Sequence, residues 1–376
     1  MKSRTNQILA LLLMWLMATT AQANDGVYFM TGNQLVPIQE TDISVAKEVL
    51  TISLCDDGYA LVDVQYEFMN NGKAKTVEMG FEASPPYNSD DAEIHKDGKH
   101  PYIYDFTVTL NGEPLTYRNA IVYSEYDKDC DFKPIDLKKY DLRNSESHTL
   151  YDAKADDYVP FAYAYYFTAH FKEGINYVHH TYRYNMSYGV GRTFEVSYKL
   201  SPAMRWANHQ IDDFTLRIKA DGTAKHFIIA DSIFRSAPFK VTEGKGKIRK
   251  NNFNVSTTTF TEVALRNGTL EWHKLNFKPT DELEISSADI YTSFSDEAYP
   301  FGYFYDRSQT YVPSWSDKPV NKRILRNLPY AHHGYVFKDA KLKAYFNKLW
   351  WYMPDPQWKA STDDFTPSEL KHIKGE

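Results

Sequence analysis

From residue 45 to about residue 84, hydrophobic and polar residues alternate with a period of two, which is typical of half-buried β-strands. Hydrophobic residues share one face of a strand at 50–54 and of a second strand at 60–68. The turn sequences Asp-Asp-Gly and Asn-Asn-Gly end at Gly58 and Gly72. Short alternating strands with tight turns between them predict an antiparallel β-sandwich.

The same alternation returns along most of the chain up to about residue 290. It predicts further strands at 106–110, 115–117, 163–171, 175–184, 193–200, 214–218, 227–229, 253–265 and 269–277. Asn267-Gly268 predicts the turn of a last hairpin, and the basic run 244–250 predicts another turn. We therefore expect a β-rich body over residues 24–290. Its pattern is compatible with two sandwich subdomains divided near residue 160.

The period of the hydrophobic pattern changes near the C-terminus. Apolar residues at positions i, i+3, i+4, i+7 and i+8 form one stripe of an α-helix, namely Leu342, Tyr345, Phe346, Leu349 and Trp350. Gly334 marks the end of an earlier helix that contains Pro329, where we expect a kink or a restart. Thr366 and Glu369 form a capping box that opens a short terminal helix. We expect a small all-α domain over 315–376, joined to the body by a connector at 291–314.

The N-terminus has the three parts of a secretory signal peptide. Lys2 and Arg4 precede a short apolar run at 8–17, and an Ala-Gln-Ala cleavage site ends at Ala23. The apolar run is too short for a comfortable membrane span. We therefore expect a signal peptide over 1–23, no transmembrane span, and an exported protein in the periplasm or outside the cell.

Composition supports a folded, strand-rich chain and limits its partners. Of 376 residues, 43% are hydrophobic and 24% are charged, which are globular values, while the aromatic content of 15% favours strands. The net charge of −6 conceals a net of +4 after residue 314 and an acidic body. So small a basic region in an acidic, exported chain argues against nucleic-acid binding.

The two cysteines, Cys55 and Cys130, are candidates for a single disulfide. An even pair in an oxidising compartment favours that bond. Two unpaired thiols are the alternative. A zinc site made by cysteines would have too few ligands at useful spacing.

The C-terminal segment resembles the YARHG domain, a module of exported bacterial proteins. The resemblance rests on Tyr330-Ala-His-His-Gly-Tyr-Val-Phe337 with Arg326, Asn327, Leu342, Tyr345, Phe346, Trp351, Tyr352 and Pro354. His332 stands where the name of the motif has Arg. The body resembles, more loosely, a family of secreted bacterial proteins without an assigned function, through the segments 67–72, 106–112, 178–183 and 211–216 and Trp206. The two resemblances imply an envelope protein with a β-rich body.

Clusters of chemically active residues are few. His179-His180 would face opposite sides of a strand, and His332-His333 lack the i, i+4 spacing of a helical zinc pair. One loop combines carboxylates and imidazoles without matching a calcium loop, namely Asp90, Asp91, His95, Asp97 and His100. No serine nucleophile elbow and no phosphate-binding glycine loop is present in the sequence. We expect no cofactor, no metal and no catalytic residues.

These patterns favour a non-catalytic binding or structural protein that docks on a cell-wall polymer or another exported protein. Its candidate binding residues lie in the C-terminal motif, namely Tyr330, His332, His333, Tyr335 and Trp351. The alternative is a periplasmic or extracellular hydrolase with its site between body and tail. A mainly structural role is the third hypothesis.

Overall fold

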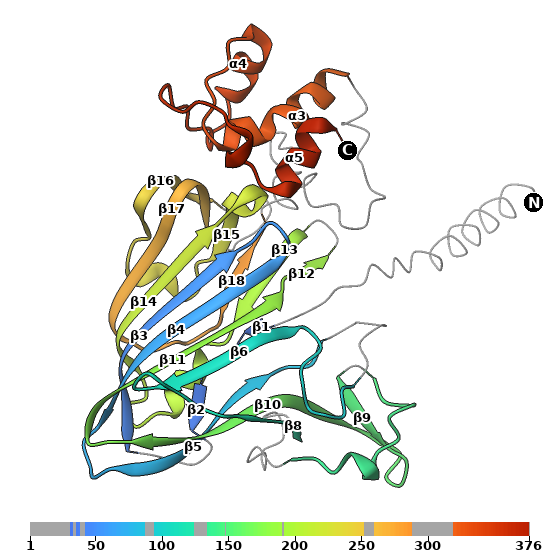
Figure 1. Ribbon diagram of the computed structural model, residues 1–376, viewed down its shortest axis with the longest axis vertical. Helices are drawn as coiled ribbons and strands as arrows, with labels where there is room; N and C mark the ends of the chain where they lie inside the picture. The colour runs from blue at the N-terminus through green and yellow to red at the C-terminus, as the bar shows by residue number, and fades with distance from the viewer. Residues whose placement is uncertain are drawn as a thin grey trace, which may run out of the picture.

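The computed structural model describes residues 31–32, 35–37, 42–86, 94–123, 134–146, 148–189, 192–251, 259–287 and 319–375. The predicted signal peptide and the predicted connector lie outside these ranges, as do Asp90, Asp91 and Cys130. A β-rich body and a helical tail are distinct in Figure 1, with the tail at one end of the body.

Thirteen strands of the described chain form one large sheet (Figure 1). In pairing order they are β1 (Thr31–Gly32), β13 (Arg192–Tyr198), β18 (Leu283–Ser286), β15 (His226–Ala230), β17 (Phe260–Phe277), β14 (Ile211–Ala220), β3 (Ile43–Leu54), β4 (Tyr59–Asn70), β11 (Gly174–Asn185), β6 (Ile103–Leu110) and β7 (Glu113–Pro114), with β12 (Ser187–Gly189) on β13 and β16 (Lys240–Asn251) on β17. Neighbours in this sheet run antiparallel, except that β3 is parallel to β14 and β1 to β13.

A second, smaller sheet packs against the large one and completes the sandwich. Its strands are β2 (Leu35–Pro37), β5 (Lys75–Ala83), β10 (Asp157–Phe171) and β8 (Arg118–Tyr123), with β9 (Thr149–Asp152) on β10. Aromatic rings connect the two sheets, since Phe81 of β5 lies 4.8 Å from Tyr182 of β11, centroid to centroid. One hydrophobic core therefore extends through both sheets. The predicted mainly β fold with an antiparallel sandwich body is confirmed.

The alternation seen in the sequence is the burial pattern of the strands. In β3, Leu50, Ile52 and Leu54 are buried, and in β4 the buried residues run alternately from Ala60 to Phe68. The residues between them point to the outer face of the sheet and are partly or fully exposed. Each strand therefore contributes apolar side chains to the core and polar side chains to one outer surface.

The predicted turn at Asn267-Gly268 is wrong, because β17 continues through it as a single strand of 18 residues. The segment 244–250, also predicted as a turn, lies within β16. Gly268 has φ +96°, and a Cβ on it would lie 2.7 Å from the Cα of Gly244. The two glycines instead allow a double irregularity where the register of β16 on β17 shifts.

Three helices form the tail: α3 (Pro319–His332), α4 (Ala340–Phe346) and α5 (Pro367–Lys374). Helix α3 passes through Pro329 without ending, and Gly334 follows it with φ +88°. Helix α4 is shorter than its hydrophobic stripe, so Leu349 and Trp350 lie beyond its end. The predicted capping box of α5 is present. The small all-α C-terminal domain is confirmed.

The core of the tail is built largely from aromatic rings. Phe337 and Phe346 stack with their centroids 4.5 Å apart, and Trp351 and Tyr352 are buried beside them. Short 3-10 turns complete the described structure, namely η1 (Leu137–Lys139), η2 (Ser201–Arg205), η3 (Gly222–Lys225), η4 (Phe234–Ser236) and η6 (Thr362–Asp364). Of these, η3 lies against α3 and α5 and so connects body to tail.

His180 is a polar residue in the middle of the aromatic core of the body. Its ring stacks on Tyr66 at 5.7 Å and on Tyr182 at 5.9 Å, centroid to centroid, and it is fully buried. Neither ring nitrogen has a hydrogen-bond partner within the described part of the chain. Burial lowers the pKa of His180 to about 3.

Replacing His180 by Phe should make the protein less sensitive to acid. An unfolded histidine takes up a proton below about pH 6.5, whereas the folded His180 stays neutral down to about pH 3. Stability tied to His180 is therefore present above pH 6.5 and lost as the pH falls, by about 2 kcal/mol at pH 5. Urea unfolding at pH 7.5 and pH 5 measures how much the free energy of unfolding falls between the two pH values. This fall should be smaller in His180→Phe than in wild type by the same amount.

The neighbouring Tyr182→Phe variant is the control, because it alters the same aromatic stack without removing an imidazole. It should retain the wild-type dependence on pH. Equal pH dependence in His180→Phe and wild type would contradict a neutral, buried His180.

Candidate functional site

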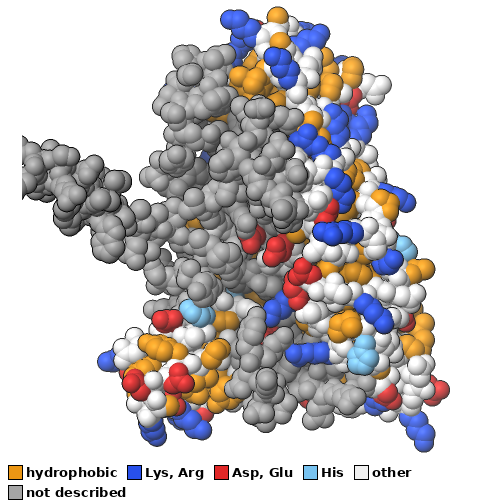
Figure 2. Space-filling model, turned by 180° about the vertical axis from the view of Figure 1, so that it is seen from behind, with side chains coloured by type: hydrophobic (Ala, Val, Ile, Leu, Met, Phe, Trp, Pro, Cys, Tyr) orange, Lys and Arg blue, Asp and Glu red, His pale blue; other side chains and the backbone are white. Residues whose placement is uncertain are grey.

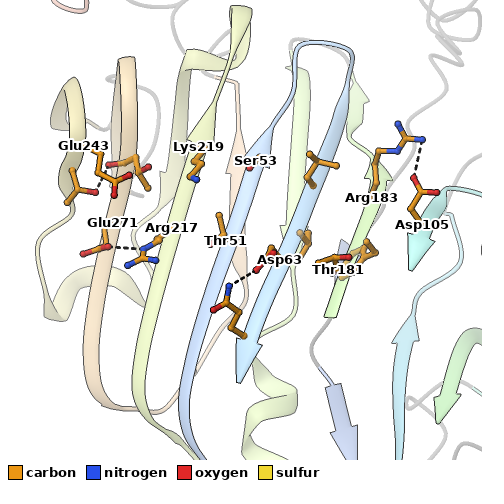
Figure 3. Close-up of a pocket in the computed structure, with 16 residues that line it drawn as sticks. Thr51, Ser53, Asp63, Asp105, Thr181, Arg183, Arg217, Lys219, Glu243 and Glu271 are labelled. Atoms are coloured by element: carbon orange, nitrogen blue, oxygen red, sulfur yellow. Dashed lines mark hydrogen bonds and ion pairs between the residues drawn. The ribbon is translucent and has the colours of Figure 1, made fainter. Parts of the chain in front are cut away.

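A groove of about 550 Å³ crosses the outer face of the large sheet. Figure 3 shows that its lining side chains come from adjacent strands, with the ends of the groove at β16–β17 and at β11–β6. Its lining comprises Thr51, Ser53, Leu61, Val62, Asp63, Gln65, Asp105, Thr181, Tyr182, Arg183, Arg217, Lys219, Thr242, Glu243, Thr269 and Glu271. Most of these residues occupy the outward-facing positions of their strands.

Strand register places the polar residues of the groove in rows across the sheet. One row runs from β17 to β11 through Glu271, Arg217, Thr51, Asp63 and Thr181, each paired with the next. At the usual distance between strands, this row is about 19 Å long. An extended molecule lying across the strands could therefore meet one polar side chain from each strand.

Several charges in the groove are paired within the protein. Arg217 Nε lies 3.0 Å from Glu271 Oε2. Asp63 accepts a hydrogen bond from Gln65 at 3.3 Å, and its other oxygen lies 2.9 Å from His179 Nε2. These pairs hold the side chains in place and leave the surface with both donors and acceptors.

Arg183 at one end of the groove has a different environment. Its guanidinium carbon lies 4.6 Å from the ring centre of Tyr59 and 5.6 Å from that of Tyr104. Its ion pair with Asp105 is long, at 3.5 Å from Nη2 to Oδ2. The aromatic rings therefore position this guanidinium more than its acidic neighbour does.

The sequence-predicted binding residues lie together in the tail, but mostly in its interior. His332 is buried with its ring 4.9 Å from that of Trp351, which is buried as well. Tyr330 is half-buried, with its ring 5.8 Å from that of Tyr335. His333 Nε2 lies 3.2 Å from the carboxylate of Glu369. These contacts give all five residues a packing role, and a binding role for them stays a prediction.

The tail is anchored to the body by contacts with β16 and β17. Lys247 Nζ donates to the carbonyl oxygens of Trp350 and Tyr352, at 2.6 and 2.9 Å. The Arg266–Asp355 ion pair measures 2.8 Å between Nη1 and Oδ2. In the view from the opposite side, Lys and Arg are frequent over the tail and the adjoining end of the body (Figure 2). Strands β16 and β17 therefore both contact the tail directly.

Buried titratable groups converge where η3 meets the tail. Glu369 is fully buried, and its carboxylate accepts from the backbone N–H of Thr366 at 3.0 Å besides contacting His333. Burial alone would raise the pKa of Glu369, but the hydrogen bond with His333 and the nearby Lys225 ammonium lower it overall. Burial also lowers the pKa of Lys225, which lies in η3. This cluster joins the cap of α5 to the body through a carboxylate that solvent does not reach.

The remaining sequence candidates are accounted for by local contacts. His179 points to the outer face and His180 to the core, as the strand geometry predicted. His100 is buried, with Nε2 3.0 Å from the Ser84 carbonyl oxygen and Nδ1 accepting from the Tyr102 N–H at 3.0 Å. Both of its nitrogens are thus engaged within the body. Among the described residues, no group of three or more His, Cys, Asp or Glu is arranged to hold a metal ion.

Cys55 follows β3, and its thiol lies 3.7 Å from the Ser53 carbonyl oxygen. Burial, followed by the charges of Asp221 and Asp57, raises the pKa of Cys55 to about 12. The thiol therefore stays protonated at neutral pH. Since Cys130 lies outside the described residues, the disulfide stays a prediction.

The groove was missed by the sequence analysis. Its residues are the polar members of the alternating strands, and the alternation itself identified them as outward-facing. Nothing in the sequence indicated that β14, about 160 residues away, pairs with β3 and brings Arg217 beside Thr51. The alternation in each strand identifies its outward-facing residues, but the groove also depends on the order of the strands in the sheet.

This geometry defines a two-part protein, a β-sandwich with an outer groove and a helical domain docked at one end. Residues 310–374 match the YARHG domain, and residues 23–197 match a domain of unknown function, DUF4424. The tail is therefore a YARHG domain, and both resemblances seen in the sequence are confirmed. A comparison with curated proteins gives no significant match.

Among solved structures, a Legionella pneumophila protein provisionally named as nutrient-binding is 18% identical, with a TM-score of 0.46 over 93% of this chain and 98% of its own. An M1 zinc metallopeptidase from Deinococcus radiodurans is 7% identical, with a TM-score of 0.26 over 67% of this chain and 43% of its own. Similarities of this size assign no function. No helix among the described residues is long and apolar enough to cross a membrane.

Replacing Glu369 by Ala should destabilise the tail strongly. The change removes the carboxylate that His333 and Lys225 face and also opens the capping box of α5. Removing one partner of a buried ion pair typically costs about 3–5 kcal/mol. Urea unfolding followed by tryptophan fluorescence checks this, since Trp350, Trp351 and Trp358 all lie in the tail.

Thr366→Ala is the matched control, because it removes the side-chain cap from the same helix and keeps the Glu369 carboxylate. Its expected cost is about 1 kcal/mol. Equal losses in the two variants would show that Glu369 acts only as a helix cap.

Proposed function

We propose that this protein is exported and binds an extended polar polymer of the cell envelope, without catalysis, through the groove on the outer face of the large sheet. The observation that carries the proposal is the row of polar side chains from β17 to β11, held in place by strand register and internal ion pairs. Paired charges and hydroxyl groups suit a ligand that hydrogen-bonds along its length.

Export is supported by the signal-peptide pattern of residues 1–23 and by the YARHG domain, a module of exported proteins. The proposed mature protein consists of a body at 24–290, a connector at 291–314 and the tail at 315–376. In an oxidising compartment, Cys55 and Cys130 would pair. The tail would contribute to binding through the exposed parts of half-buried side chains such as Tyr330 and Tyr335.

The alternative hydrolase between body and tail has one supporting observation, the convergence of Glu369, His333 and Lys225 at η3. A catalytic acid or base must reach its substrate. Glu369 is fully buried and already engaged with His333 and the cap of α5. A docking role for this cluster accounts for its burial, and we therefore favour the binding function.

Filling the groove should weaken binding to the envelope polymer strongly. Ser53 lies in the groove, beside Leu61 on one side and Lys219 on the other, so Ser53→Trp places a large ring across it. In a pelleting assay with purified cell wall, we expect Ser53→Trp to bind at least tenfold more weakly than wild type, because the ring displaces the ligand.

Thr109→Trp is the control, since Thr109 pairs with His179 on the same face but does not line the groove. It should pellet like the wild type. Unchanged binding by Ser53→Trp would show that the groove is not the site.

A further inference from the structure

We propose that the Arg183 end of the groove recognises a carboxylate group on an acidic glycan. The inference rests on the proposed binding function and adds the chemical class of the ligand. It concerns the end of the groove where β11 meets β6, to the right in Figure 3.

The first argument is the way in which Arg183 is held. Tyr59 and Tyr104 flank its guanidinium at 4.6 and 5.6 Å, and their own rings meet edge to face at 5.9 Å. Contacts with ring faces use the positive charge of the guanidinium and leave its N–H donors available. A guanidinium fixed in this way is preorganised for the two parallel hydrogen bonds of a carboxylate.

The second argument is that the protein satisfies few of these donors. A guanidinium has five N–H bonds, and Asp105 engages Arg183 at 3.5 Å, well beyond the usual length of a charge-assisted hydrogen bond. The Nε atom of Arg183 is buried, while the side chain as a whole is 38% exposed. The donors that a ligand would meet are therefore those of the two terminal nitrogens. Arg217, by contrast, is closely paired with Glu271.

The third argument is local backbone geometry. The register of β6 on β11 shifts between Thr181 and Arg183, and Asp105 lies opposite this irregularity with φ +54°. A non-glycine residue in this conformation is uncommon, and such bulges re-aim side chains at functional sites. The Asp105 side chain is 77% exposed, so it can turn toward solvent at little cost when another carboxylate takes its place.

The rest of the groove favours a glycan over a peptide. Its lining includes four partly exposed Ser and Thr hydroxyl groups, namely Thr51, Ser53, Thr181 and Thr242. Each hydroxyl donates and accepts, and so matches the hydroxyl groups of a sugar. An extended peptide typically adds to the edge of a sheet, where backbone groups are free, whereas this groove crosses the face.

Calorimetric titration of the full chain with a matched pair of glycans tests the proposal. The pair is an oligogalacturonate and its methyl ester, which share a backbone and differ in the free carboxylate. We expect wild type to bind the free acid at least tenfold more tightly than the ester. Arg183→Gln should lose about tenfold to a hundredfold in affinity for the acid and bind both glycans equally.

Two further variants separate geometry from charge. Arg183→Lys keeps the charge without the planar fork and should also lose most of the preference for the acid. Lys47→Gln removes one charge from the same outer face of the sheet, outside the groove, and should retain the preference. Equal loss in Lys47→Gln would show that general electrostatics, not Arg183, produces the selectivity.

The remaining outcomes distinguish this inference from the proposed function. One outcome is that wild type binds acid and ester with equal affinity, while Ser53→Trp binds neither. That outcome would overturn carboxylate recognition and leave groove binding intact. Arg183-dependent binding of an acidic peptide but of neither glycan would overturn the glycan class. Failure of cell wall and glycans alike to bind wild type would overturn both proposals.

Discussion

The parallel pairing of β3 with β14 is the contact on which the rest of the structure depends. It joins strands that are about 160 residues apart, over a register that runs from Val45 with Ile211 to Leu54 with Ala220. Without this pair, β3, β4, β11 and β6 would form one sheet, and β14 to β18 another. With it, the outer faces become one surface and place the polar rows of the groove side by side.

The same pairing also provides the platform for the tail. Where β3 and β14 end, the Asp221 N–H donates to the Leu54 carbonyl oxygen at 3.1 Å, and the Asp56 N–H donates to the Asp221 carboxylate at 2.8 Å. The 3-10 turn η3 begins next and carries Lys225 to the buried Glu369. One strand pairing thus determines both the alignment of the groove and the position of the helical domain.

Most local features of the fold could be predicted from the sequence, because they depend on neighbouring residues. Alternation predicted the buried faces of β3 and β4, and Thr366 with Glu369 predicted the cap of α5. The predicted hairpin turn at Asn267-Gly268 was wrong because a glycine that permits a turn also permits a close approach of two strands. Only the presence of Gly244 on the facing strand distinguishes the two cases.

The candidate site required long-range order that no local pattern contains. The C-terminal motif identified the tail correctly, but residues such as His332 and Trp351 are buried in its core. A recognisable motif therefore located a stable module, while the groove consists of ordinary outward-facing residues whose neighbours come from distant strands. The alternating pattern predicts which residues of each strand face outward, but it does not predict which of them lie side by side on neighbouring strands.

Specificity in such a groove depends on which charges the protein leaves unsatisfied. Arg217 and Asp63 already have close partners, so a ligand gains little by replacing those contacts. Arg183 is held by aromatic rings, and its one ion pair within the described residues is the long contact with Asp105, so it offers donors without first breaking a strong pair. The same residue type thus stabilises the sheet at one end of the groove and is available for recognition at the other.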